Sequence, residues 1–117
     1  MSSNLTLFDE PIEPRRPRNE VCIKEVRVEP TADAQRVAVW VELTPFIERP
    51  NIDITLWRGE EEVRSLSVVA TMQHQMQVTL HLPRHDPVGA YEVQVDLVYE
   101  DEIQQSKKAS FEVAAVS

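Results

Sequence analysis

The chain has 117 residues, a formal net charge of −8 and a single cysteine, Cys22. This length suits one domain with a continuous core, and one cysteine cannot form an internal disulfide. The negative charge argues against direct binding to nucleic acid, and a chain with neither a signal-like segment near Met1 nor a membrane-length apolar run is expected to be cytoplasmic and to bind no membrane.

The first twenty residues differ in composition from the rest of the chain. Three prolines interrupt a charged run between residues 9 and 19, and proline disfavours both a helix and a central strand. We therefore expect residues 1–20 to form an arm that is extended and largely disordered over residues 9–19. The rest of the chain, residues 21–117, is expected to form a β-domain.

The arm carries one apolar group, which consists of Leu5, Leu7 and Phe8. An apolar group on a disordered tail indicates docking on a surface. These residues belong to the pentapeptide Asn-Leu-Thr-Leu-Phe at positions 4–8. It resembles the Gln-Leu-x-Leu-Phe motif by which bacterial proteins dock on the DNA polymerase sliding clamp, although Asn4 stands in place of the glutamine. Docking on the chain's own domain, on the clamp or on another protein are the alternatives.

From residue 21 onward, apolar residues recur at every second position, which is the pattern of half-buried β-strands. Turn residues separate these runs at the short intervals typical of an all-β sandwich. Gly59 is expected in one hairpin turn with a positive φ, and an acidic turn is expected before the last strand. The apolar positions are Val26 and Val28; Val37, Val39, Val41 and Leu43; Ile52, Ile54 and Leu56; Leu66, Val68 and Ala70; Met76, Val78, Leu80 and Leu82; Tyr91, Val93, Val95, Leu97 and Tyr99; and Phe111, Val113 and Ala115.

These runs predict an all-β, seven-stranded antiparallel sandwich. Ahead of the sixth run, Leu80 and Leu82 lead to a turn with Pro87 and Gly89, and Tyr91 follows. This arrangement resembles the immunoglobulin-like and fibronectin-type-III-like superfamily. The resemblance implies a tyrosine corner, in which the Tyr91 hydroxyl bonds back to the preceding loop. The missing cysteine pair departs from antibody domains.

Trp40 and Trp57 are out of phase with the apolar residues of their runs. We therefore expect both side chains on outer faces of the sandwich. Large exposed aromatic residues mark binding surfaces. The alternatives are that the arm covers one or both rings, or that a bulge shifts their register.

Few residues could carry other chemistry. His81, His85 and Asp86 could form a surface metal site, but a spacing of four suits a helix, and this segment predicts a strand end and a loop. The acidic runs 60–62 and 100–102 lack the spacing of a calcium-binding loop and fit solvated hairpin turns.

The sequence therefore predicts a non-enzymatic binding or assembly domain, an accessory subunit of a larger cytoplasmic complex, with no cofactor and no metal. This interpretation allows the chain to form a homo-oligomer through its edge strands or its arm. The alternatives are a metal-binding protein or unrecognised enzyme that uses the His81, His85 and Asp86 loop, and an extracellular adhesion-like domain. The expected contacts with a protein partner are Leu5, Leu7, Phe8, Trp40 and Trp57.

Overall fold

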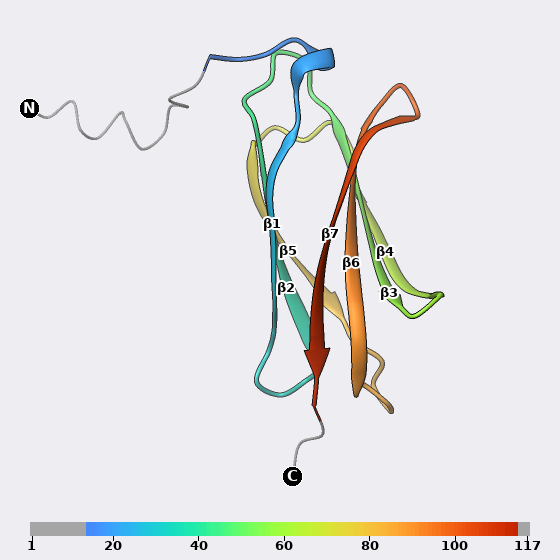
Figure 1. The fold of residues 1–117 in the computed structure, drawn as a ribbon. Helices are drawn as coiled ribbons and strands as arrows, with labels where there is room; N and C mark the ends of the chain where they lie inside the picture. The colour runs from blue at the N-terminus through green and yellow to red at the C-terminus, as the bar shows by residue number, and fades with distance from the viewer. Residues whose placement is uncertain (1–13, 115–117) are drawn as a thin grey trace, which may run out of the picture.

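The computed structural model describes residues 14–114, which form two antiparallel β-sheets packed face to face (Figure 1). One sheet has the strand order β1-β2-β5, and the other has the order β4-β3-β6-β7. The predicted seven-stranded antiparallel sandwich is confirmed. The elements are a short 3-10 helix η1 (Arg18–Glu20) and the strands β1 (Ile23–Pro30), β2 (Arg36–Leu43), β3 (Asn51–Arg58), β4 (Glu61–Val68), β5 (Gln75–His81), β6 (Gly89–Tyr99) and β7 (Glu102–Val113).

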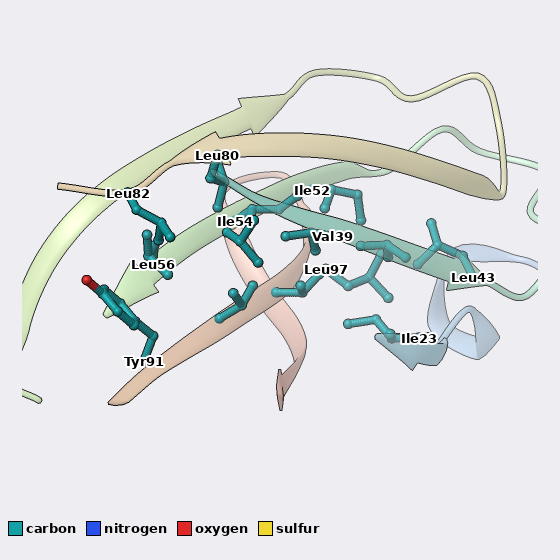
Figure 2. Packing of buried hydrophobic residues seen from close by; sticks show 14 of the residues in the cluster. Ile23, Val39, Leu43, Ile52, Ile54, Leu56, Leu80, Leu82, Tyr91 and Leu97 are labelled. Carbon is teal, nitrogen blue, oxygen red and sulfur yellow. The ribbon is translucent and has the colours of Figure 1, made fainter. Parts of the chain in front are cut away.

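Alternating aliphatic residues build the core between the sheets. In β2 and β3 every second side chain is buried, so each strand has one face in the core and one face outside. Side chains from both sheets meet between the layers (Figure 2). Each fully buried leucine, isoleucine or valine contributes about 1.5–3 kcal/mol relative to exposure. Those without measurable exposure are Val37, Val39, Leu43, Ile52, Ile54, Leu56, Val93, Val95 and Leu97.

The expected turns are present, with strained backbone at the acidic one. Gly59 has a φ of +64° between β3 and β4, as predicted. Glu100 and Asp101 connect β6 to β7 with φ values of 51° and 64°. A two-residue hairpin with positive φ at both positions matches the right-handed twist of the strands, but it normally uses asparagine and glycine. Ala70, expected inside a strand, lies beyond the end of β4 and also has a positive φ of 49°.

The strand β7 begins earlier than the apolar pattern predicts. It starts at Glu102, and its residues Gln105 and Lys107 pair with the inward-facing residues of β6. Gln105 Oε1 accepts a hydrogen bond from Ile23 N at 2.6 Å, and Lys107 Nζ donates to Lys24 O at 3.3 Å. Polar side chains occupy this inner phase because they satisfy backbone groups on the edge of β1. These side-chain bonds connect β7 to β1 along one side of the sandwich, where the two strands belong to different sheets and do not pair through their backbones.

The Tyr91 side chain closes the end of the core, and the hydrogen bond that the resemblance implied is present. Its hydroxyl donates to Pro87 O at 2.7 Å and accepts from Arg58 Nη1 at 3.2 Å. Its ring stacks on Phe111 with a centroid separation of 5.1 Å. With only 2% exposure, Tyr91 therefore ties the loop before β6 to the core.

Candidate functional site

Trp40 lies in the middle of the outer face of the β1-β2-β5 sheet. In the strand register its neighbours are Arg27 on β1 and Gln77 on β5. The guanidinium carbon of Arg27 lies 4.6 Å from the centroid of the Trp40 ring, within the range of a cation–π contact. The ring is half-buried, and its outward phase agrees with the prediction.

A shallow hollow of about 430 Å³ lies beside this ring. Trp40 is the apolar side chain that faces outward here, whereas Val41 and Met76, which also line the hollow, pair with each other in register on the core-facing phase. Charged and amide side chains surround Trp40 on the outer face. We call this area the Trp40 surface and define it by Glu25, Arg27, Trp40, Glu42, Gln75 and Gln77.

Trp57 lies on the outer face of the other sheet, as predicted. Its register neighbours are Glu62 on β4 and Glu92 on β6. The β3–β4 pairing has an irregularity between Leu56 and Trp57, but the β3–β6 pairing stays regular, so the alternative of a bulge that turns the ring inward does not apply. The indole Nε1 is buried without a hydrogen-bond partner among the described residues, so an acceptor on another molecule could reach it only after local movement.

A row of polar side chains also crosses the four-stranded sheet. Asp53 and Asp96 are register neighbours on β3 and β6. Ser67 Oγ donates to Asp53 Oδ1 at 2.7 Å, and Ser106 Oγ donates to Asp96 Oδ1 at 2.6 Å. Gln94 Nε2 adds a bond of 2.9 Å to the same Asp96 oxygen. These donors account for a carboxylate at only 7% exposure, and the row needs no ligand to explain it.

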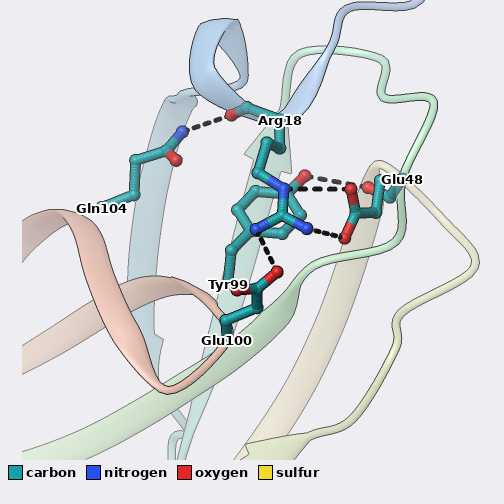
Figure 3. Close-up of polar contacts among 5 residues, drawn as sticks. All are labelled: Arg18, Glu48, Tyr99, Glu100 and Gln104. Carbon is teal, nitrogen blue, oxygen red and sulfur yellow. Dashed lines mark hydrogen bonds and ion pairs between the residues drawn. The ribbon is translucent and has the colours of Figure 1, made fainter.

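The segment before β1 is attached to one end of the sandwich through Arg18 (Figure 3). Arg18 forms a forked pair with Glu48, in which Nε–Oε1 is 3.0 Å and Nη2–Oε2 is 2.6 Å. Its Nη1 lies 2.8 Å from Glu100 Oε2 on the β6–β7 hairpin. Gln104 Nε2 donates to Arg18 O at 2.6 Å. We call this group the Arg18 latch.

Tyr99 lies beneath the Arg18 latch. Its ring centroid is 5.4 Å from the Arg18 guanidinium carbon, and its hydroxyl donates to Glu48 O at 2.9 Å. Burial, followed by the nearby Glu48 carboxylate, raises the pKa of Tyr99 to about 12. Hydrogen bonds to Glu48 and Glu100 also raise the pKa of Arg18. The phenol therefore stays neutral and keeps donating to the β2–β3 loop.

Backbone hydrogen bonds also hold the chain just before η1 against the sandwich. Arg16 N donates to Pro45 O at 3.0 Å, and Ile47 N donates to Arg16 O at 3.0 Å, so contact with the sandwich begins before η1. The prolines and the charged run predicted a largely disordered segment here. The sequence did not reveal these contacts, because the acidic partners of Arg18 lie far away along the chain. Leu5, Leu7 and Phe8 lie outside the described residues, and their docking stays a prediction.

The residues that suggested a metal site lie at the end of β5 and in the loop that follows it. His81 ends β5, whereas His85 and Asp86 are exposed in the loop that follows. Asp86 uses its backbone oxygen to accept a bond of 2.6 Å from Arg58 Nη1. Within residues 14–114, no group of three or more histidine, cysteine, aspartate and glutamate side chains is placed to hold a metal ion.

Comparison with known proteins leaves the function to be argued from these surfaces. No protein-family model matches the chain, and no curated protein matches it. Over the described part of the chain, helices long and apolar enough to cross a membrane are absent. A sandwich fold hosts many unrelated functions, so the fold alone does not select one.

Proposed function

We propose that this chain is a non-enzymatic binding or assembly domain that acts as an accessory subunit of a larger cytoplasmic complex. The observation that carries the proposal is the Trp40 surface. Tryptophan and arginine are enriched among the residues that dominate binding energy at protein interfaces. Here Trp40 and Arg27 stack on each other on the open face of a sheet.

The composition of the Trp40 surface supports a protein as the partner. Trp40 supplies an apolar centre on the outward-facing phase of β2. Glu25, Gln75 and Gln77 surround it with polar groups. An apolar centre with a polar rim is the usual anatomy of a protein–protein interface.

The strand order supports an immunoglobulin-like sandwich of the fibronectin-type-III kind. Three strands, β1-β2-β5, face four strands, β4-β3-β6-β7, so the fourth strand joins the second sheet. The Tyr91 hydroxyl bonds back to Pro87 as a tyrosine corner requires. Domains of this architecture are common binding modules, and the proposal places this chain among them.

The arm supplies a second contact in this proposal. The Arg18 latch holds the segment before β1 at one end of the sandwich. In this proposal the apolar side chains Leu5, Leu7 and Phe8 make the second contact. They dock either on a sandwich, its own or that of a second copy, or on another protein, for which the sliding clamp is one named candidate.

The test is affinity purification from the native host followed by mass spectrometry, with two matched variants. Gln77→Arg adds a bulky charge beside Trp40, whereas Thr79→Arg adds the same side chain on the same face of β5 beside Ala38. We expect Gln77→Arg to lose the partner that the wild type retains and Thr79→Arg to keep it. Removing residues 1–9 tests the arm separately. Equal partner recovery with Gln77→Arg and with wild type would contradict the role of the Trp40 surface.

A further inference from the structure

Three arginines gather around one hollow at the end of the sandwich opposite the Arg18 latch. Arg36 begins β2, Arg64 lies on β4, and Arg84 follows the end of β5. The hollow has a volume of about 700 Å³. We call it the arginine hollow and define it by Gln35, Arg36, Arg64, His81, Leu82 and Arg84. This concentration of positive charge contrasts with the net charge of −8 of the chain.

The position of Arg64 explains why the hollow is open. In register it pairs with Leu56, so it occupies the inward phase of β4, where a central strand would carry an apolar residue. The strands β4 and β5 are edges of different sheets and do not pair with each other. Arg64 Nε reaches across this side and donates to His81 O at 3.3 Å. The guanidinium therefore lies at a gap between the sheets.

The positive charge of the arginine hollow is poorly neutralised from within the chain. Arg36 Nη2 lies 3.8 Å from Asp33 Oδ2, and that carboxylate is held mainly by the Thr31 hydroxyl at 2.5 Å. Within residues 14–114, Arg84 has no hydrogen bond or ion pair, and Arg64 bonds only to a backbone carbonyl. None of the acidic residues in that range is paired with either of these two arginines.

We propose that the arginine hollow binds an acidic peptide segment of a partner protein, with side-chain carboxylates at Arg64 and Arg84. Arginine suits this ligand because its guanidinium forms forked, charge-assisted hydrogen bonds with carboxylates. The guanidiniums come from three separate segments around a broad opening, which suits several carboxylates along a chain better than one small anion.

The strand edges beside the hollow also favour an extended peptide. Among the described residues, β5 pairs only with β2 and β4 pairs only with β3, so in that part of the chain each strand has one unpaired edge on this side. Free edges offer backbone groups to which a peptide can add as a further strand. A nucleic acid is disfavoured because the chain as a whole is strongly negative. This site shares no residue with the Trp40 surface, so the inference is independent of the proposed function.

The test measures binding of a fluorescent hexaglutamate peptide with blocked ends to the full chain at low salt. Fluorescence anisotropy reports the binding. A hexaglutamine peptide is the uncharged control probe. Arg84→Glu removes a side chain that has no hydrogen bond or ion pair with residues 14–114, so the fold should be kept. Arg49→Glu is the matched control, because it changes the net charge equally in the β2–β3 loop at the other end of the sandwich.

We expect Arg84→Glu to weaken hexaglutamate binding at least about tenfold, as the loss of one charge-assisted pair implies, and Arg49→Glu to weaken it less than about threefold. Arg64→Met should weaken binding as Arg84→Glu does. Equal weakening by Arg84→Glu and Arg49→Glu would overturn the proposal, since it would reflect overall charge alone. Full displacement of the peptide by inorganic phosphate at matched ionic strength would overturn it in favour of a small-anion site.

Discussion

Replacing Tyr91 by phenylalanine removes one oxygen atom from the end of the core and leaves the ring in place. The hydroxyl donates to Pro87 O at 2.7 Å and accepts from Arg58 Nη1 at 3.2 Å. The ring keeps its stacking on Phe111 at 5.1 Å, so the apolar core is unchanged. The substitution therefore isolates the two hydrogen bonds.

The expected cost follows from what each partner loses. Pro87 O loses its donor from a side chain that is only 2% exposed, which costs about 1 kcal/mol. Arg58 Nη1 keeps its shorter bond of 2.6 Å to Asp86 O, so we assign only about 0.5 kcal/mol to its bond with the hydroxyl. The sum of about 1.5 kcal/mol corresponds to a fall in melting temperature of about 6 °C for a domain of this size.

Urea unfolding of wild type, Tyr91→Phe, Arg58→Met and the double variant measures the contributions of both hydrogen bonds to the free energy of unfolding. The Tyr91→Phe midpoint should fall with an unchanged dependence on urea. The double-variant cycle should give a coupling of about 0.5 kcal/mol between Arg58 and Tyr91. A free energy of unfolding within about 0.3 kcal/mol of wild type for Tyr91→Phe would contradict this prediction, because the hydroxyl bonds would then contribute nothing measurable to stability.

Two further predictions concern the β6–β7 hairpin. The pKa of Tyr99 is raised from 10.0 to about 12, so the folded chain holds more protons than the unfolded chain between these values, and the free energy of unfolding should fall as pH rises from 10 to 12. An ultraviolet absorbance titration compared with Tyr99→Phe checks this, and an ordinary phenol pKa at this site would contradict it. Asp101→Gly should stabilise the chain by about 0.5–1 kcal/mol because its φ is 64°, whereas Glu102→Gly in β7 should destabilise it by a similar amount; urea midpoints compare the two.

The strands whose inward and outward side chains were predicted along their whole length have the same position in the fold. The strands β2, β3 and β6 lie inside their sheets, with one face in the core. Their inward side chains must then be apolar at every second position, and that pattern is visible in the chain itself. The outward phase of Trp40 and Trp57 followed from the same alternation.

The edge strands β1 and β5 keep this pattern, but β4 and β7 depart from it in part, because some of their inward positions meet other partners. Gln105 and Lys107 of β7 face backbone groups of β1, and Arg64 of β4 reaches the backbone of β5. A polar residue at such a position is indistinguishable in the sequence from one in a loop. The long polar part of β7 was therefore not predicted as strand.

The fold class and the phase of the central strands could be predicted from the chain alone, because both depend on residues that are neighbours in sequence. The bond from the Tyr91 hydroxyl to Pro87 O was implied by the resemblance and is present. Which distant polar groups meet became visible only in the folded chain. Arg18 finds Glu48 and Glu100, and Arg64 comes to the same hollow as Arg84, because of the strand order and the sheet edges. Contacts between distant charged side chains leave no periodic signal in the sequence, so both the Arg18 latch and the arginine hollow appear only once the two sheets are packed together.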